Sequence, residues 1–175
     1  QTCALPICVL GTDGTSRHNE SLLAKARGLT HDGISAYMLT GSYEIPVHNM
    51  TGDVRRDIIL INECLGVGEI ALSDHRSSQP TRAELEKILT QSRLGGMLSG
   101  KAGVVQFHMG VGERGIDVLF DIVRETEIPA KHFIPTHVNR AFHLFAQAKE
   151  FAKLGGYIDI TSGIREQDGF PACVK

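Results

Sequence analysis

Two kinds of segment alternate along the chain. The first kind is short, apolar on both faces and rich in β-branched residues, which is typical of buried parallel strands. In the second kind, apolar residues recur every three or four positions, as on one face of an amphipathic helix. We predict strands at residues 7–10, 35–39, 69–72, 103–107, 132–134 and 157–160.

Helices are predicted between these strands, at residues 16–29, 53–65, 81–93, 115–126 and 141–154. The third begins at Thr81 and carries Glu84 three residues later, the spacing of a capping box. Glycines mark the expected helix ends, at Gly66, at Gly95 and Gly96, and at Gly155.

Alternating strands and helices predict an α/β fold with a parallel sheet and right-handed crossovers. Two architectures fit this order, a doubly wound open sheet and part of a (β/α)₈ barrel. The chain contains neither G-x-G-x-x-G nor G-x-x-x-x-G-K-[ST], so the common phosphate-binding fingerprints are absent. Their absence disfavours a nucleotide-binding sheet and leaves both architectures open.

Composition excludes several classes of function. The chain has 175 residues, of which 42% are hydrophobic and 22% charged, as expected of one globular domain. A net charge of −2 gives no basic patch for nucleic acid or an anionic membrane, and no apolar run is long enough to span a bilayer. Four scattered cysteines without a C-x-x-C pair indicate a reduced, cytoplasmic protein.

Polar residues at the strand ends are the candidates for chemistry, because the carboxyl ends of parallel strands meet at one edge. His108 and His137 follow this rule on consecutive strands, Glu69 stands at the start of the predicted strand before them, and Arg76 and Arg140 lie close to these residues in sequence. A carboxylate and two imidazoles suit Zn²⁺ or a similar cation, and guanidinium groups suit a substrate carboxylate. Asp74 and His75 form either a supporting pair or a helix cap.

The remaining histidines fall in predicted helices or loops, and we interpret them as ordinary surface residues. They are His18, His31, His48, His132 and His143.

Five motifs together resemble the isoaspartyl (β-aspartyl) dipeptidases, which belong to the amidohydrolase superfamily of (β/α)₈ metallohydrolases. They are LGTDGTSRH at 10–18, MLTGSY at 38–43, EIALSDHR at 69–76, FHMG at 107–110 and PTHVNR at 135–140. The resemblance runs from about residue 9 to residue 164, so it covers nearly the whole chain.

The resemblance implies a role for each matching residue. Glu69 corresponds to a carboxylate that bridges two Zn²⁺ ions, and His108 and His137 to the ligands of the second ion. Tyr43 corresponds to the tyrosine that polarises the scissile carbonyl. Thr12, Arg76 and Arg140 correspond, together with Tyr43, to residues that hold a small dipeptide substrate. The complete enzymes of the family form homo-oligomers.

The chain also departs from the family pattern. It contains no H-x-H, which in the family lies on the first barrel strand, and it stops before the family's metal-binding aspartate. We therefore expect a partial (β/α)₈ TIM barrel of about six β/α units, without the first and last strands, at residues 8–164. Residues 1–7 resemble a translated sequencing adapter and are expected to be non-native, and residues 165–175 form a divergent tail.

Three functions remain open on this reasoning. The first is hydrolysis of isoaspartyl dipeptides in the complete enzyme, with the fragment impaired or inactive. The second is another amidohydrolase activity, on a cyclic amide. The third is a non-catalytic remnant that binds a metal ion or a carboxylate.

Overall fold

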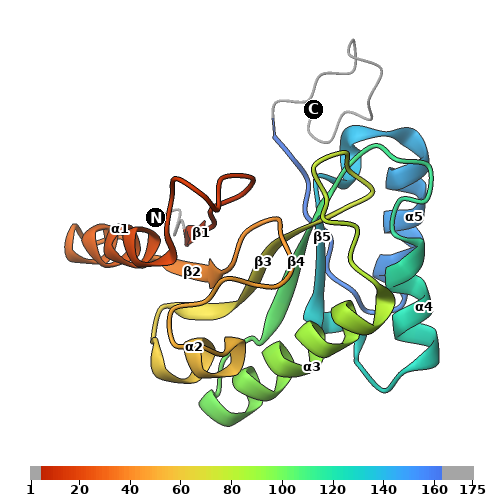
Figure 1. The fold of residues 1–175 in the computed structure, drawn as a ribbon. Helices are drawn as coiled ribbons and strands as arrows, with labels where there is room; N and C mark the ends of the chain where they lie inside the picture. Colours follow the sequence, from red (N-terminus) through yellow and green to blue (C-terminus); the bar gives the residue numbers. More distant parts are fainter. Residues whose placement is uncertain (1–4, 163–175) are drawn as a thin grey trace.

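Five parallel strands form one sheet and follow one another in chain order (Figure 1). The computed structural model describes residues 5–162. The strands are β1 (Ile7–Cys8), β2 (Tyr37–Thr40), β3 (Cys64–Leu72), β4 (Val104–Met109) and β5 (Phe133–Thr136). Each strand pairs only with its neighbours in the sequence. A doubly wound sheet reverses its strand order at a switch point, so this sequential order identifies part of a barrel.

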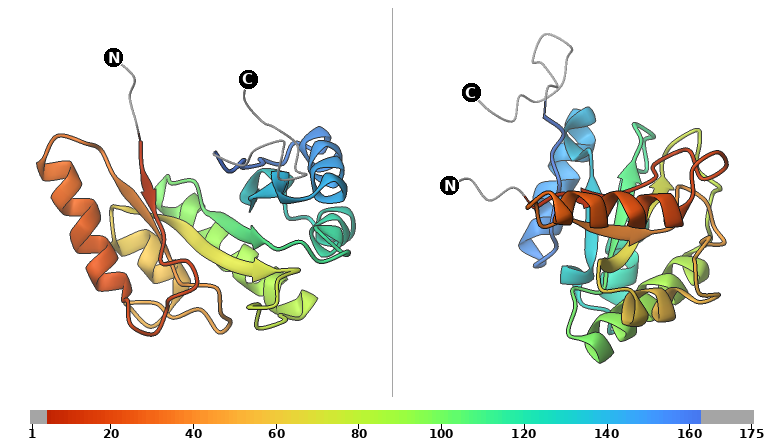
Figure 2. Two further views of the ribbon diagram at one scale, coloured as in Figure 1. Left: turned by 90° about the horizontal axis from the view of Figure 1, so that it is seen from above. Right: turned by 90° about the vertical axis from the view of Figure 1, so that its left-hand side faces the viewer.

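The helices follow the curl of the sheet along its outer side (Figure 2). They are α1 (Asn19–His31), α2 (Val54–Leu60), α3 (Arg82–Ser99), α4 (Asp117–Glu125) and α5 (Phe142–Lys153). Two short 3₁₀ turns, η1 (Ala130–His132) and η2 (Val138–Arg140), flank β5. In Figure 1, α2 and α3 lie below the sheet and α4 and α5 to its right. The predicted α/β fold is therefore confirmed as a partial barrel, with five strands among the described residues where about six units were expected.

The core lies between the sheet and these helices. Phe107 of β4, Phe133 of β5 and Phe151 of α5 are fully buried. The Phe133 ring centroid lies 6.1 Å from that of Phe107 and 6.0 Å from that of Phe151. Burying large apolar side chains is the main stabilising contribution to such a layer, at about 25 cal/mol per Å².

The third helix starts as predicted and continues further. Thr81 is its N-cap and forms the capping box with Glu84. The predicted stop at Gly95 and Gly96 is wrong, because α3 runs on to Ser99. Gly96 is needed for packing, since a Cβ at this position would lie 2.6 Å from the Cα of Gly103.

The second helix is shorter than predicted and the third strand is longer. Helix α2 ends at Leu60, and Lys101 Nζ donates to the main-chain oxygens of Ile58 and Ile61, 2.5 and 2.6 Å away. Strand β3 starts at Cys64, five residues before the predicted start at Glu69. Glycines in this segment weakened the strand pattern of the sequence, so the extension was not predicted. Gly66 is required there because the backbone of β4 approaches it closely.

The sixth predicted strand, residues 157–160, is wrong. Asp159 donates its N–H to Pro135 O (3.0 Å) and accepts from Val138 N (3.3 Å), so the segment runs beside the end of β5. Both bonds are made by the single residue Asp159, so they do not form the repeating hydrogen-bond ladder of paired strands. The side chain of Tyr157 is also largely exposed, which a buried strand would not allow.

Two other expectations concern the chain ends and membranes. Most of the adapter-like segment and the whole tail at 165–175 lie outside the described residues. Within residues 5–162, none of the helices combines the length and the apolar character that a bilayer crossing requires.

Candidate metal centre

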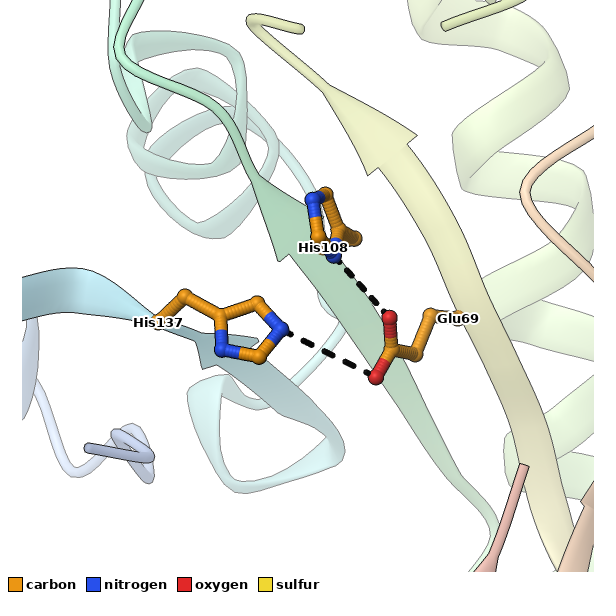
Figure 3. Close-up of side chains that lie close together, drawn as sticks. All are labelled: Glu69, His108 and His137. Atoms are coloured by element: carbon orange, nitrogen blue, oxygen red, sulfur yellow. Dashed lines mark hydrogen bonds and ion pairs between the residues drawn. The ribbon is translucent and has the colours of Figure 1, made fainter. Parts of the chain in front are cut away.

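Glu69, His108 and His137 come from three adjacent strands and converge at the carboxyl edge of the sheet (Figure 3). Glu69 lies within β3, His108 is the penultimate residue of β4, and His137 directly follows β5. One donor atom from each residue lies within 4.8 Å of the other two. The structure therefore assembles the three predicted ligands into one group.

A bulge in β3 sets the position of Glu69. The register passes from Val67 opposite Val105 to Ile70 opposite Phe107, so two β3 residues face the single residue Gln106. The first of the two is Gly68, where a Cβ would approach the Gln106 Cβ to 2.9 Å. A bulge re-aims side chains and is common beside active sites, which explains how a mid-strand residue becomes a candidate ligand.

The Glu69 carboxylate faces both imidazoles (Figure 3). Its Oε2 is 3.0 Å from His108 Nδ1, and its Oε1 is 4.0 Å from His137 Nε2. The second distance is too long for a hydrogen bond.

His137 is held in place through its other ring nitrogen. Nδ1 contacts Thr161 Oγ1 at 2.5 Å, which leaves Nε2 facing Glu69. Burial, followed by the nearby Arg140 guanidinium, lowers the pKa of His137 to about 4. The ring is therefore neutral at pH 7, as an imidazole must be to donate a lone pair to a metal ion.

His108 is surrounded by the other predicted site residues. Tyr43 Oη lies 2.5 Å from its Nδ1. Arg76 Nη2 and Arg140 Nη1 lie 3.0 and 2.9 Å from its Nε2. Only 1% of His108 is exposed, so these polar groups meet inside the protein. Tyr43, Arg76 and Arg140 are thus brought to the candidate ligands.

Tyr43 lies in the loop that follows β2. Burial and the neighbouring Glu69 raise the pKa of its phenol to about 12. The Arg76 guanidinium carbon also lies 5.2 Å from the centre of the ring. The phenol consequently keeps its proton at neutral pH and can donate a hydrogen bond.

Asp74 supports Arg76, which decides between the two sequence-based interpretations of this position. Arg76 Nε and Nη2 donate to the two carboxylate oxygens of Asp74, at 2.9 and 2.8 Å. This paired contact holds the pKa of Asp74 well below its usual range. The side chain of His75 is 88% exposed, so Asp74 alone takes the supporting role.

The outcomes for two other sequence-based expectations differ. Thr12 lies in an exposed turn after β1, and its predicted role in substrate binding stays a prediction. The surface interpretation of His132 is wrong, because this ring is buried and its Nδ1 lies 2.9 Å from Gly103 O. Thr161, which orients His137, was not predicted.

The donor set fits a divalent cation. One carboxylate and two imidazoles are borderline ligands of the kind that bind Zn²⁺, and all three are held by neighbouring groups. The site is thus a carboxylate with two imidazole nitrogens facing its two oxygens, a set that could hold a divalent cation.

No family model matches the sequence. Among solved structures, the chain is similar to a β-aspartyl dipeptidase from the thermophilic, keratin-degrading Fervidobacterium islandicum AW-1, crystallised with a β-Asp-Leu dipeptide. The two are 51% identical over 95% of this chain, with a TM-score of 0.91. A second crystal structure of the dipeptidase from that organism is 53% identical over 89% of the chain, with a TM-score of 0.88. The chain spans 43% and 42% of those two chains. The family resemblance seen in the five motifs is confirmed.

Proposed function

The chain is related to the β-aspartyl dipeptidases, and on that premise we propose that it carries part of the active site of a metal-dependent hydrolase of isoaspartyl dipeptides. The observation that carries the proposal is the convergence of Glu69, His108 and His137 beside a buried tyrosine and two arginines. The similarity supplies the substrate class, because one relative was crystallised with β-Asp-Leu.

Glu69, His108 and His137 are the residues that would hold the metal. We propose Zn²⁺, because mixed imidazole and carboxylate sets are typical of catalytic zinc. We propose further that Glu69 would be shared by two ions, on the strength of the family motif, in which both histidines are ligands of the second ion. Bound zinc supplies Lewis acidity and a water of lowered pKa.

Tyr43 would stabilise the oxygen of the scissile carbonyl. Its proton is retained at neutral pH, and its hydroxyl lies in the group of candidate ligands. A fixed donor in a water-poor site stabilises the negative charge that develops on that oxygen during attack. Removing one such donor typically slows the reaction by about 10²–10³-fold.

Arg76 and Arg140 would bind the substrate's carboxylates. An isoaspartyl dipeptide carries two of these groups, and guanidinium pairs with each through parallel hydrogen bonds. Asp74 fixes Arg76, while Met109 O receives a hydrogen bond from Arg140 (3.2 Å), so both are oriented before substrate arrives. Thr12 is proposed as a further contact on the strength of the family motif alone.

Peptidase assays on the full-length protein test the proposal. We expect cleavage of β-Asp-Leu at least about tenfold faster than of α-Asp-Leu, loss of activity on chelation, and recovery with Zn²⁺. His108→Ala should abolish cleavage. The matched control is His31→Ala, at an exposed histidine of α1, which should cleave like the wild type.

The result also separates the alternatives. Hydrolysis of a neutral cyclic amide without cleavage of β-Asp-Leu would establish the other amidohydrolase activity and contradict the dipeptidase. Stoichiometric metal binding without any hydrolysis would identify a binding remnant.

A further inference from the structure

A long loop carries Tyr43 to the site. It runs from residue 41 to residue 53, between β2 and α2 (Figure 1), and has no helix or strand of its own. Loops of this length are uncommon in compact domains and are usually functional. An unconstrained loop would sample many conformations, at a cost of about 1–2 kcal/mol for each residue that must be ordered.

Asp57 binds both ends of this loop. It lies in α2 and is fully buried. Its Oδ2 accepts from Thr40 Oγ1 (2.6 Å), at the end of β2, and from Met50 N (3.0 Å). Its Oδ1 accepts from Thr51 N (2.9 Å) and from Thr51 Oγ1 (2.7 Å). One carboxylate therefore joins the last residue before the loop to two residues near its far end.

The set of donors indicates a specific role. All four are uncharged hydroxyl or main-chain groups, so the buried carboxylate has no cation among them. Burying a carboxylate is costly unless its oxygens are satisfied, and here each oxygen accepts two bonds. Helix capping does not explain the residue, because Asp53 already caps α2 through Arg56 N.

Further contacts extend the constraint to Tyr43. The buried Asn19 accepts from Gly41 N (3.1 Å) and donates to His48 O (2.9 Å), which braces the loop from the side of α1. Tyr43 N donates to Gly11 O (3.2 Å), and Tyr43 O accepts from Ala71 N (3.1 Å). The tyrosine thus sits where a braced loop meets the ends of the neighbouring strands.

We infer that Asp57 is a positioning residue that holds the loop 41–53 so that the Tyr43 hydroxyl stays at the metal ligands. Its catalytic consequence rests on the proposed dipeptidase function, whereas the structural constraint does not. Asp57 touches none of Glu69, His108 and His137 through a hydrogen bond among the described residues, and it acts through Tyr43.

Amide hydrogen exchange tests the structural constraint without any activity assay. Asp57→Asn places an NH₂ against two donors, so exchange at Met50 and Thr51 should accelerate at least about tenfold. The inference predicts acceleration at the Tyr43 and Ala71 amides as well. Asp53→Ala is the matched control, because it removes the α2 cap and costs about 1 kcal/mol without touching the loop contacts.

Exchange at Tyr43 that is unchanged in Asp57→Asn, or equally accelerated in Asp53→Ala, would overturn the inference. Should Asp57→Asn fail to fold, Thr40→Val removes a single donor and should give the same pattern with a smaller amplitude.

A double-variant cycle tests the catalytic consequence on β-Asp-Leu. Asp57→Asn should lower kcat at least about tenfold, with a smaller change in KM. Combined with Tyr43→Phe, it should lower kcat no further than Tyr43→Phe alone, because both changes remove the same hydroxyl from its position. Multiplicative effects would contradict the inference. An inactive wild type would overturn the proposed dipeptidase function, and the exchange experiment would still decide the role of Asp57.

Discussion

At the scale of single residues, burial separates the histidines of this chain into different roles. His108 and His137 lie at the sheet edge, where both rings face the Glu69 carboxylate. His132 is buried near the opposite ends of β4 and β5, beside Gly103, and has no carboxylate among its hydrogen-bond partners. The same side chain therefore serves as a candidate ligand at one end of the strands and as a neutral packing residue at the other.

His132 gives a pH-dependent contribution to stability. Burial lowers its pKa, with Arg93 and Lys131 adding to the effect against the hydrogen bond to Gly103. The unfolded chain, with a histidine pKa of about 6.5, then binds a proton more readily than the folded one. The free energy of unfolding should fall as the pH drops below about 6.5, the pKa in the unfolded chain, towards the lower pKa of the folded chain. Raising the pH above about 6.5 should restore it.

Urea unfolding of wild type and His132→Gln at pH 7.5 and pH 5.5 measures this contribution. The wild type should lose more stability between the two pH values than His132→Gln does. Equal losses would show that this ring does not titrate differently in the folded and unfolded states.

Residue identities at the site could be predicted from sequence, and their supporting contacts could not. Strand-end positions identified His108 and His137 because parallel strands end at one edge. Glu69 stood at the start of its predicted strand, and its role as a ligand followed from the family motif. The role of Thr161 depends on its contact with His137, and the burial of His132 goes with its contact to Gly103. Each contact joins residues more than twenty positions apart, so no local sequence pattern could predict it.

At the scale of elements, close packing determines where glycine is required. In α3, a Cβ on Gly96 would lie 2.6 Å from Gly103 Cα and 2.8 Å from Lys101 O. These neighbours are backbone atoms, which cannot move aside without displacing the start of β4. In α1, a Cβ on Gly28 would meet nothing within 4 Å.

The two glycines should therefore respond in opposite ways to alanine. Gly96→Ala should destabilise the protein by about 1–3 kcal/mol through overpacking, and Gly28→Ala should stabilise it by about 0.5–1 kcal/mol through helix propensity. Chemical denaturation of both variants checks the signs. A neutral or stabilising Gly96→Ala would contradict the close approach of α3 to the strand.

The same packing explains where sequence patterns located the elements and where they failed. Amphipathic periodicity found all five helices, and the capping box at Thr81 fixed the start of α3. The glycine pair at 95–96 was interpreted as a stop because a sequence does not show which neighbour approaches a glycine. Gly66 and Gly68 likewise hid the first half of β3.

At the scale of the whole molecule, the candidate ligands form a group only when the sheet has formed. They come from β3, from β4 and from the end of β5, and residues 69 and 137 are far apart in the sequence. Zinc that binds this group should therefore stabilise the folded state. The expected gain is about 2.7 kcal/mol at a free zinc concentration one hundred times Kd.

The five motifs made the barrel family recognisable from the sequence, whereas the number of units could not be predicted from periodicity. Residues 157–160 have the composition of a strand and make two backbone bonds to the end of β5, yet they do not join the sheet within the described residues. An apolar segment becomes a strand only when a neighbour offers a matching edge, and periodicity carries no information about neighbours.

Zinc binding by the full-length protein tests the central claim most directly. After removal of free metal, we predict that the wild type and His31→Ala retain zinc. Glu69→Gln, His108→Ala and His137→Ala should each lose part or all of it, together with the zinc-dependent rise in thermal midpoint. Retention of the same amount of zinc by all three ligand variants, or no retention by the wild type, would contradict the assignment of this group as a metal centre.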